Sequence, residues 1–216
     1  MSYARPRPSS SFEIALIVAI FSGWFIIASI NAVMTGFPAP TLSDRDAIGL
    51  IVLECVAFAV AATVLYARGW RKNDFAFRVT WWLTLIGVIL FLAVVFIDFT
   101  VLRAVGALLG GVDFVEEFGR SISLSLPLAA LLSVINGAFE EFFLTRYLIE
   151  ALAEHGVPIA LGVSSLVRVM YHLYQGPTGA VAVLIFGLIV TMFYWRYREV
   201  WPTMTAHMSV DFIAFI

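Results

Sequence analysis

Two adjacent glutamates, Glu140 and Glu141, stand in the middle of a stretch of mostly apolar residues. A carboxylate placed in hydrocarbon costs at least ~2.5 kcal/mol, so an adjacent pair needs a polar cavity, a partner or a chemical task. A carboxylate in a poorly hydrated site can take a proton from water and act as the general base of a hydrolysis. The pair is therefore the first candidate for the chemistry of this protein.

Other polar residues recur in the apolar segments at helical spacing, three, four or seven residues apart, which places them on common helix faces. These faces hold Ser133, Asn136 and Glu140; Ser165, Arg168, His172 and Gln175; and Thr203, His207 and Asp211. A lone serine or asparagine on such a face is explained by hydrogen bonds between membrane helices. Two histidines and two glutamates are not, so the pattern predicts that Glu140, Glu141, His172 and His207 converge on one site.

The helix rise allows the depths of these residues to be compared. Glu141 precedes Gly156, in a predicted turn, by 15 residues, and His172 follows it by 16, so both lie about 22 to 24 Å from that turn. His207 lies only about 12 Å from the turn that precedes it, so its helix must tilt to reach the same level. Arg168, one turn before His172, is expected to pair with one of the glutamates because an unpaired arginine inside a span is costly.

The composition places these residues in a membrane protein. The chain has 216 residues, of which 62% are hydrophobic and 13% charged, and its mean hydropathy is +0.97. Soluble proteins have about 25% charged residues, so a soluble enzyme is excluded. The single cysteine, Cys55, excludes an internal disulfide. A lipid bilayer is the expected surrounding, no nucleic-acid partner is expected, and the sequence does not define an oligomeric state.

Seven apolar segments predict an all-α, polytopic transmembrane helical bundle with about seven spans. They cover about residues 14–34, 47–66, 77–96, 122–152, 163–174, 181–195 and 201–216. The fourth has 31 residues, or about 46 Å as a helix, which exceeds the hydrocarbon core and predicts a kink at Pro127 or Gly137. The expected organisation is a disordered tail at 1–12, N-terminal transmembrane helices with an interfacial loop at 98–120 within 13–121, and a four-helix core carrying the site at 122–216.

The basic residues orient the bundle. With the N-terminus inside, the inner segments hold nine lysine and arginine residues and the outer segments hold three, while Arg168 lies within a span. Because basic residues favour the inner side of a membrane, this distribution predicts an N-terminus inside.

Three motifs in the C-terminal half resemble those of a known family. Glu140-Glu141 is followed by Phe142-Phe143-Leu144, the second motif reads Tyr171-His172-Leu-Tyr-Gln175-Gly176, and the third is His207-xxx-Asp211. In this order on successive helices, they resemble the motifs of the CPBP family of intramembrane proteases, the type II CAAX prenyl endopeptidases and their bacterial bacteriocin-immunity relatives. The resemblance covers about residues 122–216. It implies an endopeptidase of the bacterial cytoplasmic membrane that acts on a peptide or a membrane protein.

Three positions depart from the family pattern. The arginine that is usual four residues after the second glutamate is replaced by Thr145, and Arg146 follows one place later. Arg168 stands where phenylalanine is usual, and Asp211 replaces an asparagine that is common in the prenyl proteases. Since one residue turns an α-helix by about 100°, Arg146 is expected to face a different direction from the usual arginine.

The resemblance implies hydrolysis of a peptide bond without a covalent intermediate. Its catalytic residues are Glu140, Glu141, His172, His207 and Asp211, supported by Arg168, Asn136 and Gln175. Glu140 and His172 would activate water, and Glu141 would orient a histidine or share the base role. His207, with Asp211 behind it, would donate to the developing oxyanion or to the leaving amine.

Two alternatives stay open. Two glutamates and two histidines could bind Zn²⁺ and a water molecule. Adjacent glutamates point about 100° apart on a helix and no His-Glu-x-x-His motif supports zinc, so no metal or other cofactor is expected. The same polar cavity could also belong to a non-catalytic membrane scaffold or to a proton-coupled transporter, although no pair of helix breaks indicates a transport site.

Overall fold

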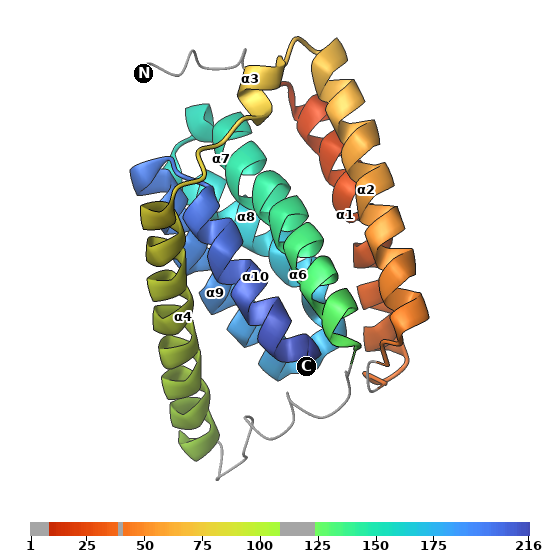
Figure 1. Cartoon of the computed structure of the whole chain (residues 1–216), viewed down its shortest axis with the longest axis vertical. Helices are drawn as coiled ribbons and strands as arrows, with labels where there is room; N and C mark the ends of the chain where they lie inside the picture. The colour runs from red at the N-terminus through yellow and green to blue at the C-terminus, as the bar shows by residue number, and fades with distance from the viewer. Residues whose placement is uncertain (1–8, 39–40, 109–123) are drawn as a thin grey trace.

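The computed structural model describes residues 9–38, 41–108 and 124–216, which are almost entirely helical (Figure 1). The long elements are α1 (Ser11–Met34), α2 (Asp44–Ala67), α4 (Trp81–Leu108), α6 (Leu126–Glu140) continued by η1 (Glu141–Tyr147) and α7 (Leu148–Ala151), α8 (Val157–His172), α9 (Gly176–Tyr197) and α10 (Trp201–Phe215). The short elements are α3 (Lys72–Phe75), η2 (Ala153–His155) and η3 (Leu173–Gln175). The predicted all-α bundle of about seven spans is confirmed.

Five helical segments are long and apolar enough to cross a membrane, judged by length and composition. They are Ser11–Met34, Asp44–Ala67, Trp81–Ala107, Leu126–Ala151 and Val157–Tyr197, the last of which combines α8 and α9. Large apolar side chains stand exposed on the outer helices, among them Trp24 of α1, Val52 of α2 and Phe96 of α4. Such surfaces suit contact with lipid rather than with water.

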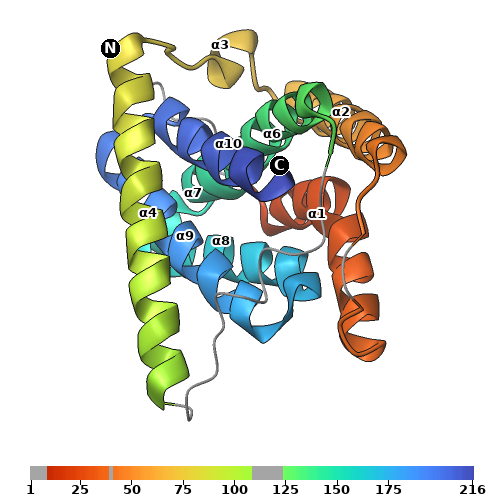
Figure 2. The same ribbon diagram turned by 60° about the horizontal axis from the view of Figure 1, so that its bottom comes forward.

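Helices α6 and α10 lie side by side in the middle of the bundle (Figures 1 and 2). Helix α2 packs against α6, α4 packs against α10, α8 packs against α9, and α1 covers α8. The two central helices touch at Gly137, where a Cβ atom would lie 2.9 Å from the backbone nitrogen of Met208. A small residue at a helix contact allows the backbones to approach closely in a membrane protein.

The fourth span changes from α-helix to π-helix at Glu141. In η1 the N–H group of Leu148 donates to the carbonyl of Phe143, five residues earlier, which is the hydrogen-bond pattern of a π-helix. The irregularity predicted at Pro127 or Gly137 therefore lies elsewhere. Pro127 stands in the first turn of α6, where a missing N–H group costs nothing.

Two boundaries differ from the prediction. Helix α4 continues to Leu108, so residues 98–108 are helical instead of forming part of an interfacial loop. The guanidinium of Arg103 lies 4.6 Å from the ring centre of Phe99, which accommodates a charged side chain on this helix. Ser10 caps α1 by accepting a hydrogen bond from the N–H of Glu13 at 3.2 Å, so the helix includes residues 11 and 12. The predicted tail at 1–8 and the loop at 109–120 lie outside the described residues.

Candidate active site

The polar faces of three helices meet inside the bundle. Glu140 ends α6 and Glu141 begins η1, His172 ends α8, and His207 lies in the middle of α10; all four side chains are buried. Nε2 of His172 lies 3.6 Å from Oε1 of Glu140, and Nδ1 of His207 lies 2.8 Å from Oε1 of Glu141. The predicted convergence of these four residues is confirmed.

The carboxylate of Glu141 is held by three side chains. Its Oε1 lies 2.8 Å from Nη2 of Arg168 and 2.8 Å from Nδ1 of His207. Its Oε2 accepts a hydrogen bond from the hydroxyl of Thr145 at 2.6 Å. Charge-assisted bonds of this kind are strong, and together they occupy both carboxylate oxygens. Glu141 is therefore placed to orient His207, which is one of the two roles predicted for it.

Glu140 has different surroundings. Its Oε2 has no hydrogen-bond partner among the residues that the structure describes. Nη1 of Arg168 lies 3.7 Å and Nε2 of His207 lies 4.0 Å from this oxygen, while Nε2 of His172 lies 3.6 Å from the other. These separations are too long for direct hydrogen bonds and suit bridging by a water molecule. Glu140 thus turns one carboxylate oxygen toward each histidine.

Arg168 pairs with the glutamates as predicted. Its guanidinium contacts Glu141 directly and donates to Thr145 at 3.1 Å. Helix α9 makes room for the side chain at Gly187, where a Cβ atom would lie only 2.8 Å from Cδ of Arg168. The carbonyl of Arg168 lies 3.0 Å from Nδ1 of His172, so this nitrogen is the donor and Nε2 is the nitrogen that faces Glu140.

Asp211 does not stand behind His207 as predicted. Its Oδ1 lies 3.6 Å from Nε2 of His207, whereas the opposite ring nitrogen contacts Glu141. The amide of Asn136 donates to Oδ2 of Asp211 at 2.8 Å and so joins α6 to α10 beside the site. The supporting residue of His207 is therefore Glu141 of η1, because the imidazole ring is turned with Nδ1 toward it.

Gln175 and Arg146 lie outside this cluster. Gln175, predicted to support the site, lies in η3 and donates to the hydroxyl of Tyr174 at 3.3 Å. It makes no polar contact with the four converging residues in the described part of the chain. Arg146 points away, as expected, and donates to the carbonyl of Ala76 at 2.8 Å. The guanidinium of the site is thus supplied by α8 instead of by the helix that carries the glutamates.

The sequence reasoning missed Glu54 of α2. This side chain is 2% exposed and interacts electrostatically with Glu140, Asp211 and His207. A lone carboxylate in the middle of a predicted span is a signal that could have identified it. Gly187 was missed as well, because a glycine in an apolar helix carries no such signal.

The arrangement of the donors does not match a zinc site. Among residues 9–38, 41–108 and 124–216, no three histidine, cysteine, aspartate or glutamate side chains are grouped so that they could hold a metal ion. The carboxylate of Glu141 is occupied by His207 and Thr145, and the guanidinium of Arg168 stands beside both glutamates. This guanidinium would repel a second cation at the same carboxylates.

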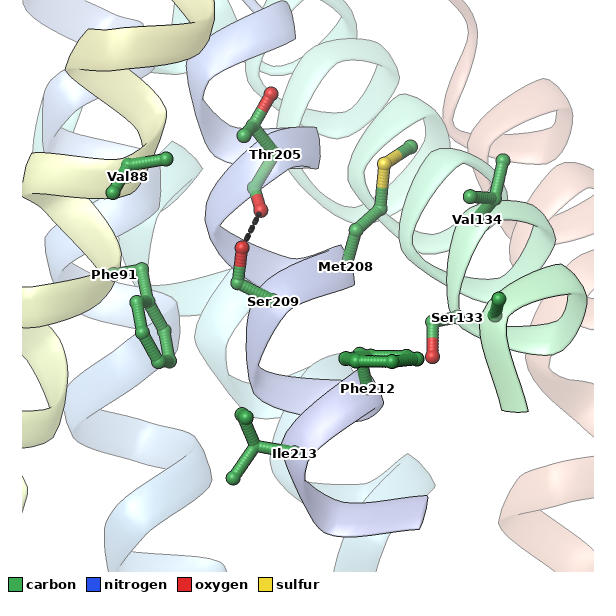
Figure 3. Close-up of a pocket in the computed structure, with 10 residues that line it drawn as sticks. Val88, Phe91, Ser133, Val134, Thr205, Met208, Ser209, Phe212 and Ile213 are labelled. Atoms are coloured by element: carbon green, nitrogen blue, oxygen red, sulfur yellow. Dashed lines mark hydrogen bonds between the residues drawn. The ribbon is translucent and has the colours of Figure 1, made fainter. Parts of the chain in front are cut away.

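A separate groove of about 430 Å³ lies between α4 and α6, over α10 (Figure 3). Its walls are mainly apolar, and the partly exposed side chains of Val134 and Ile213 line its edge. The hydroxyl of Ser209 donates to the carbonyl of Thr205 at 2.8 Å, so it offers no free donor to the groove. None of the residues predicted to be catalytic lines this groove.

Residues 122–213 match the family model described as type II CAAX prenyl endopeptidase Rce1-like. The matched segment includes all five residues predicted to be catalytic, and it confirms the resemblance that the three motifs predicted. No curated protein and no solved structure matches the chain. The family match, which is to CAAX-type intramembrane proteases, and the five apolar helical segments identify an integral membrane protein.

Proposed function

We propose that this chain, with its Rce1-like segment, is an intramembrane endopeptidase in which Glu140 activates water for attack on a peptide bond. The difference between the two adjacent glutamates carries the proposal. Both oxygens of Glu141 are occupied, whereas Oε2 of Glu140 has no hydrogen-bond partner among the described residues and faces His207, while Oε1 of Glu140 faces His172. A general base must reach the proton that it removes, directly or through one water molecule. Glu140 meets this requirement and Glu141 does not.

The proposed reaction starts with a water molecule beside Glu140 and Nε2 of His172. Glu140 takes a proton from this water while the water oxygen bonds to the carbonyl carbon of the substrate. The electron pair of the C=O bond moves onto its oxygen. His207, protonated at both ring nitrogens and held by Glu141 through Nδ1, donates a hydrogen bond from Nε2 to this oxyanion. When the carbonyl re-forms, the C–N bond breaks and the proton on Glu140 passes to the leaving amine.

The reaction as proposed requires no metal ion, and the guanidinium beside both glutamates supports this choice. The substrate is proposed to be a peptide or a membrane protein. We propose an N-terminus inside on the basis of the distribution of the basic residues. The bacterial cytoplasmic membrane is proposed from the family that the three motifs resemble.

The experiment that tests the function compares the membrane proteomes of cells that carry the wild type and Glu140→Gln. Glu150→Gln is a matched control, because Glu150 bonds to Tyr194 outside the site. Proteins that are cleaved in cells with the wild type or Glu150→Gln, and intact with Glu140→Gln, are the expected result. Those proteins are then incubated with purified enzyme in liposomes. Continued cleavage by folded Glu140→Gln would exclude Glu140 as the base, and identical proteomes throughout would favour a scaffold or a transporter.

A further inference from the structure

Glu54 is a buried carboxyl group to which the proposed reaction gives no role. It belongs to the face of α2 that points into the bundle, together with Ala47, Ala57, Ala61 and Leu65. Ten residues separate it from one end of α2 and 13 from the other, which corresponds to about 15 and 20 Å of helix. Glu54 therefore lies deep in the span, where an unneeded carboxyl group would be costly.

Two contacts define the level of Glu54 relative to α6. At the start of both helices, the N–H of Ser125 donates to Oδ1 of Asp44 at 2.9 Å. Farther along, the ring centres of Phe58 and Phe142 lie 5.7 Å apart. Helices α2 and α6 thus run in the same direction, side by side (Figure 1). Since Glu54 precedes Phe58 by one turn, it lies level with the last turn of α6, at the end of which Glu140 stands.

Within the described residues, three buried polar atoms from three helices lack partners in this part of the bundle. They are Oε2 of Glu54, Oε2 of Glu140 and the hydroxyl oxygen of Tyr171, and each is buried without a hydrogen-bond partner among the described residues. Glu54 interacts electrostatically with Glu140, and Tyr171 interacts with both of them. Buried polar atoms are nearly always hydrogen-bonded, and a buried water molecule typically bonds to about three groups that would otherwise be unsatisfied.

We propose that Glu54, Glu140 and Tyr171 together bind water inside the membrane domain, and that Glu54 and Tyr171 are positioning residues for the water that Glu140 activates. The catalytic part rests on the proposed function, whereas the binding of water does not. A hydrolase in a bilayer must hold its second reactant within the protein, because the surrounding hydrocarbon offers no water.

The N-terminal helices thereby complete a site whose motifs all lie after residue 122. Helix α2 supplies Glu54, and α1 fixes Tyr171 from the other side. The ring of Phe25 lies 4.5 Å from that of Tyr171, and the hydroxyl of Ser29 donates to the carbonyl of Tyr171 at 2.6 Å.

X-ray hydroxyl-radical footprinting of the full chain in lipid nanodiscs tests the binding of water, since radicals formed from a bound water molecule label adjacent side chains. Tyr171 is expected to be labelled although it is 3% exposed, whereas Tyr194, which is 2% exposed and whose hydroxyl donates to Glu150, is expected to be protected. Glu54→Leu should lower the labelling of Tyr171 several-fold, and Glu54→Gln should retain it. A Tyr171 as protected as Tyr194, or labelling that Glu54→Leu leaves unchanged, would overturn the proposal.

Turnover tests the positioning role with a smaller change. Tyr171→Phe removes one oxygen and keeps the ring, so it tests the positioning role even if Glu54→Leu does not fold. It is expected to lower kcat about tenfold or more with little change in KM, because misplacing a reactant slows the chemical step. Tyr194→Phe, the matched control, removes a hydroxyl that bonds to Glu150 outside the site and should keep the wild-type kcat. An unchanged kcat in folded Tyr171→Phe would overturn the positioning role. A labelled Tyr171 in a wild type without any peptidase activity would instead confirm the water site and reject the proposed function.

Discussion

Nδ1 of His207 lies 2.8 Å from Oε1 of Glu141, although 66 positions separate the two residues in the chain. Nε2 of the same ring lies 4.0 Å from Oε2 of Glu140. Adjacent residues of a helix point about 100° apart, so one imidazole can meet both glutamates only with different ring nitrogens. This geometry assigns different tasks to two side chains of identical chemistry.

Glu141→Gln is expected to destabilise the protein more than Glu140→Gln. The carboxylate of Glu141 pairs with the guanidinium of Arg168 at 2.8 Å, and breaking a buried ion pair on one side costs about 3 to 5 kcal/mol. Glu140 is 3.7 Å from the same guanidinium and lacks a direct hydrogen bond at Oε2, so its neutralisation is expected to cost about 1 kcal/mol. Chemical unfolding of both variants in one detergent measures the difference. Equal losses would show that Arg168 does not depend on Glu141.

Gly187→Ala is expected to lower activity without touching any predicted catalytic residue. The new Cβ atom would lie 2.8 Å from Cδ and 3.2 Å from Nε of Arg168, so the side chain that pairs with Glu141 must shift. Even a shift of about 1 Å can slow an enzyme by ~100-fold. Gly162→Ala on α8 is the matched control, because no atom lies within 4 Å of its Cβ position. A kcat that is the same in the two alanine variants would contradict the role given to Gly187.

Arg168→Phe is expected to inactivate the protein, and Thr145→Arg added to it is expected to restore part of the activity. The double variant has phenylalanine before the histidine and arginine four residues after the second glutamate, which is the arrangement usual in the family that the motifs resemble. Thr145 contacts both Glu141 and Arg168, so an arginine at position 145 starts close to the carboxylate that needs a partner. The activity and the unfolding midpoint of both single variants and the double variant form a cycle. If the losses of the two single variants simply add in the double variant, an arginine at position 145 does not replace Arg168 as the partner of Glu141.

Purified wild-type protein is expected to contain no stoichiometric metal and to keep its activity after treatment with a chelator. The guanidinium of Arg168 neutralises the glutamate pair, and cation binding there would require that it leave. Metal analysis by mass spectrometry checks this directly. One zinc ion per chain, lost in His172→Ala and restored together with activity by added zinc, would make the protein a metalloprotease.

Most of the residues that form the candidate active site could be predicted, because they are polar residues in otherwise apolar helices. The pairing of Arg168 could be predicted because an unpaired guanidinium inside a span is costly, and two glutamates lie at the right depth to pair with it. Glu54 carries a similar cost but belongs to no stripe of polar residues, and Gly187 carries no charge at all. Their importance depends on which faces of α2 and α9 turn toward the site, and this is a property of the tertiary packing.

The details of the helices were harder to predict than their number. The interfacial loop was expected to begin at residue 98, but α4 continues to Leu108. The position of Asp211 relative to His207 depends on the rotation of an imidazole ring and on the tilt of α10, neither of which residue spacing defines. The kink was expected at a proline or a glycine, and no residue type marks the change to a π-helix.

The π-helix Glu141–Tyr147 is equivalent to one extra residue inserted into an α-helix. Such an insertion turns every later side chain about the helix axis by one residue. The side chains before Glu141 and those after Tyr147 can therefore face different parts of the protein without a loop between them. The hydroxyl of Ser164 donates to the carbonyl of Leu144 and ties this widened turn to α8. Removing one residue from positions 142–144 would restore a regular helix and rotate Leu148 and its neighbours by about 100° relative to the glutamates. The number of residues in this segment therefore decides whether α7 can pack in the core while Glu141 faces His207.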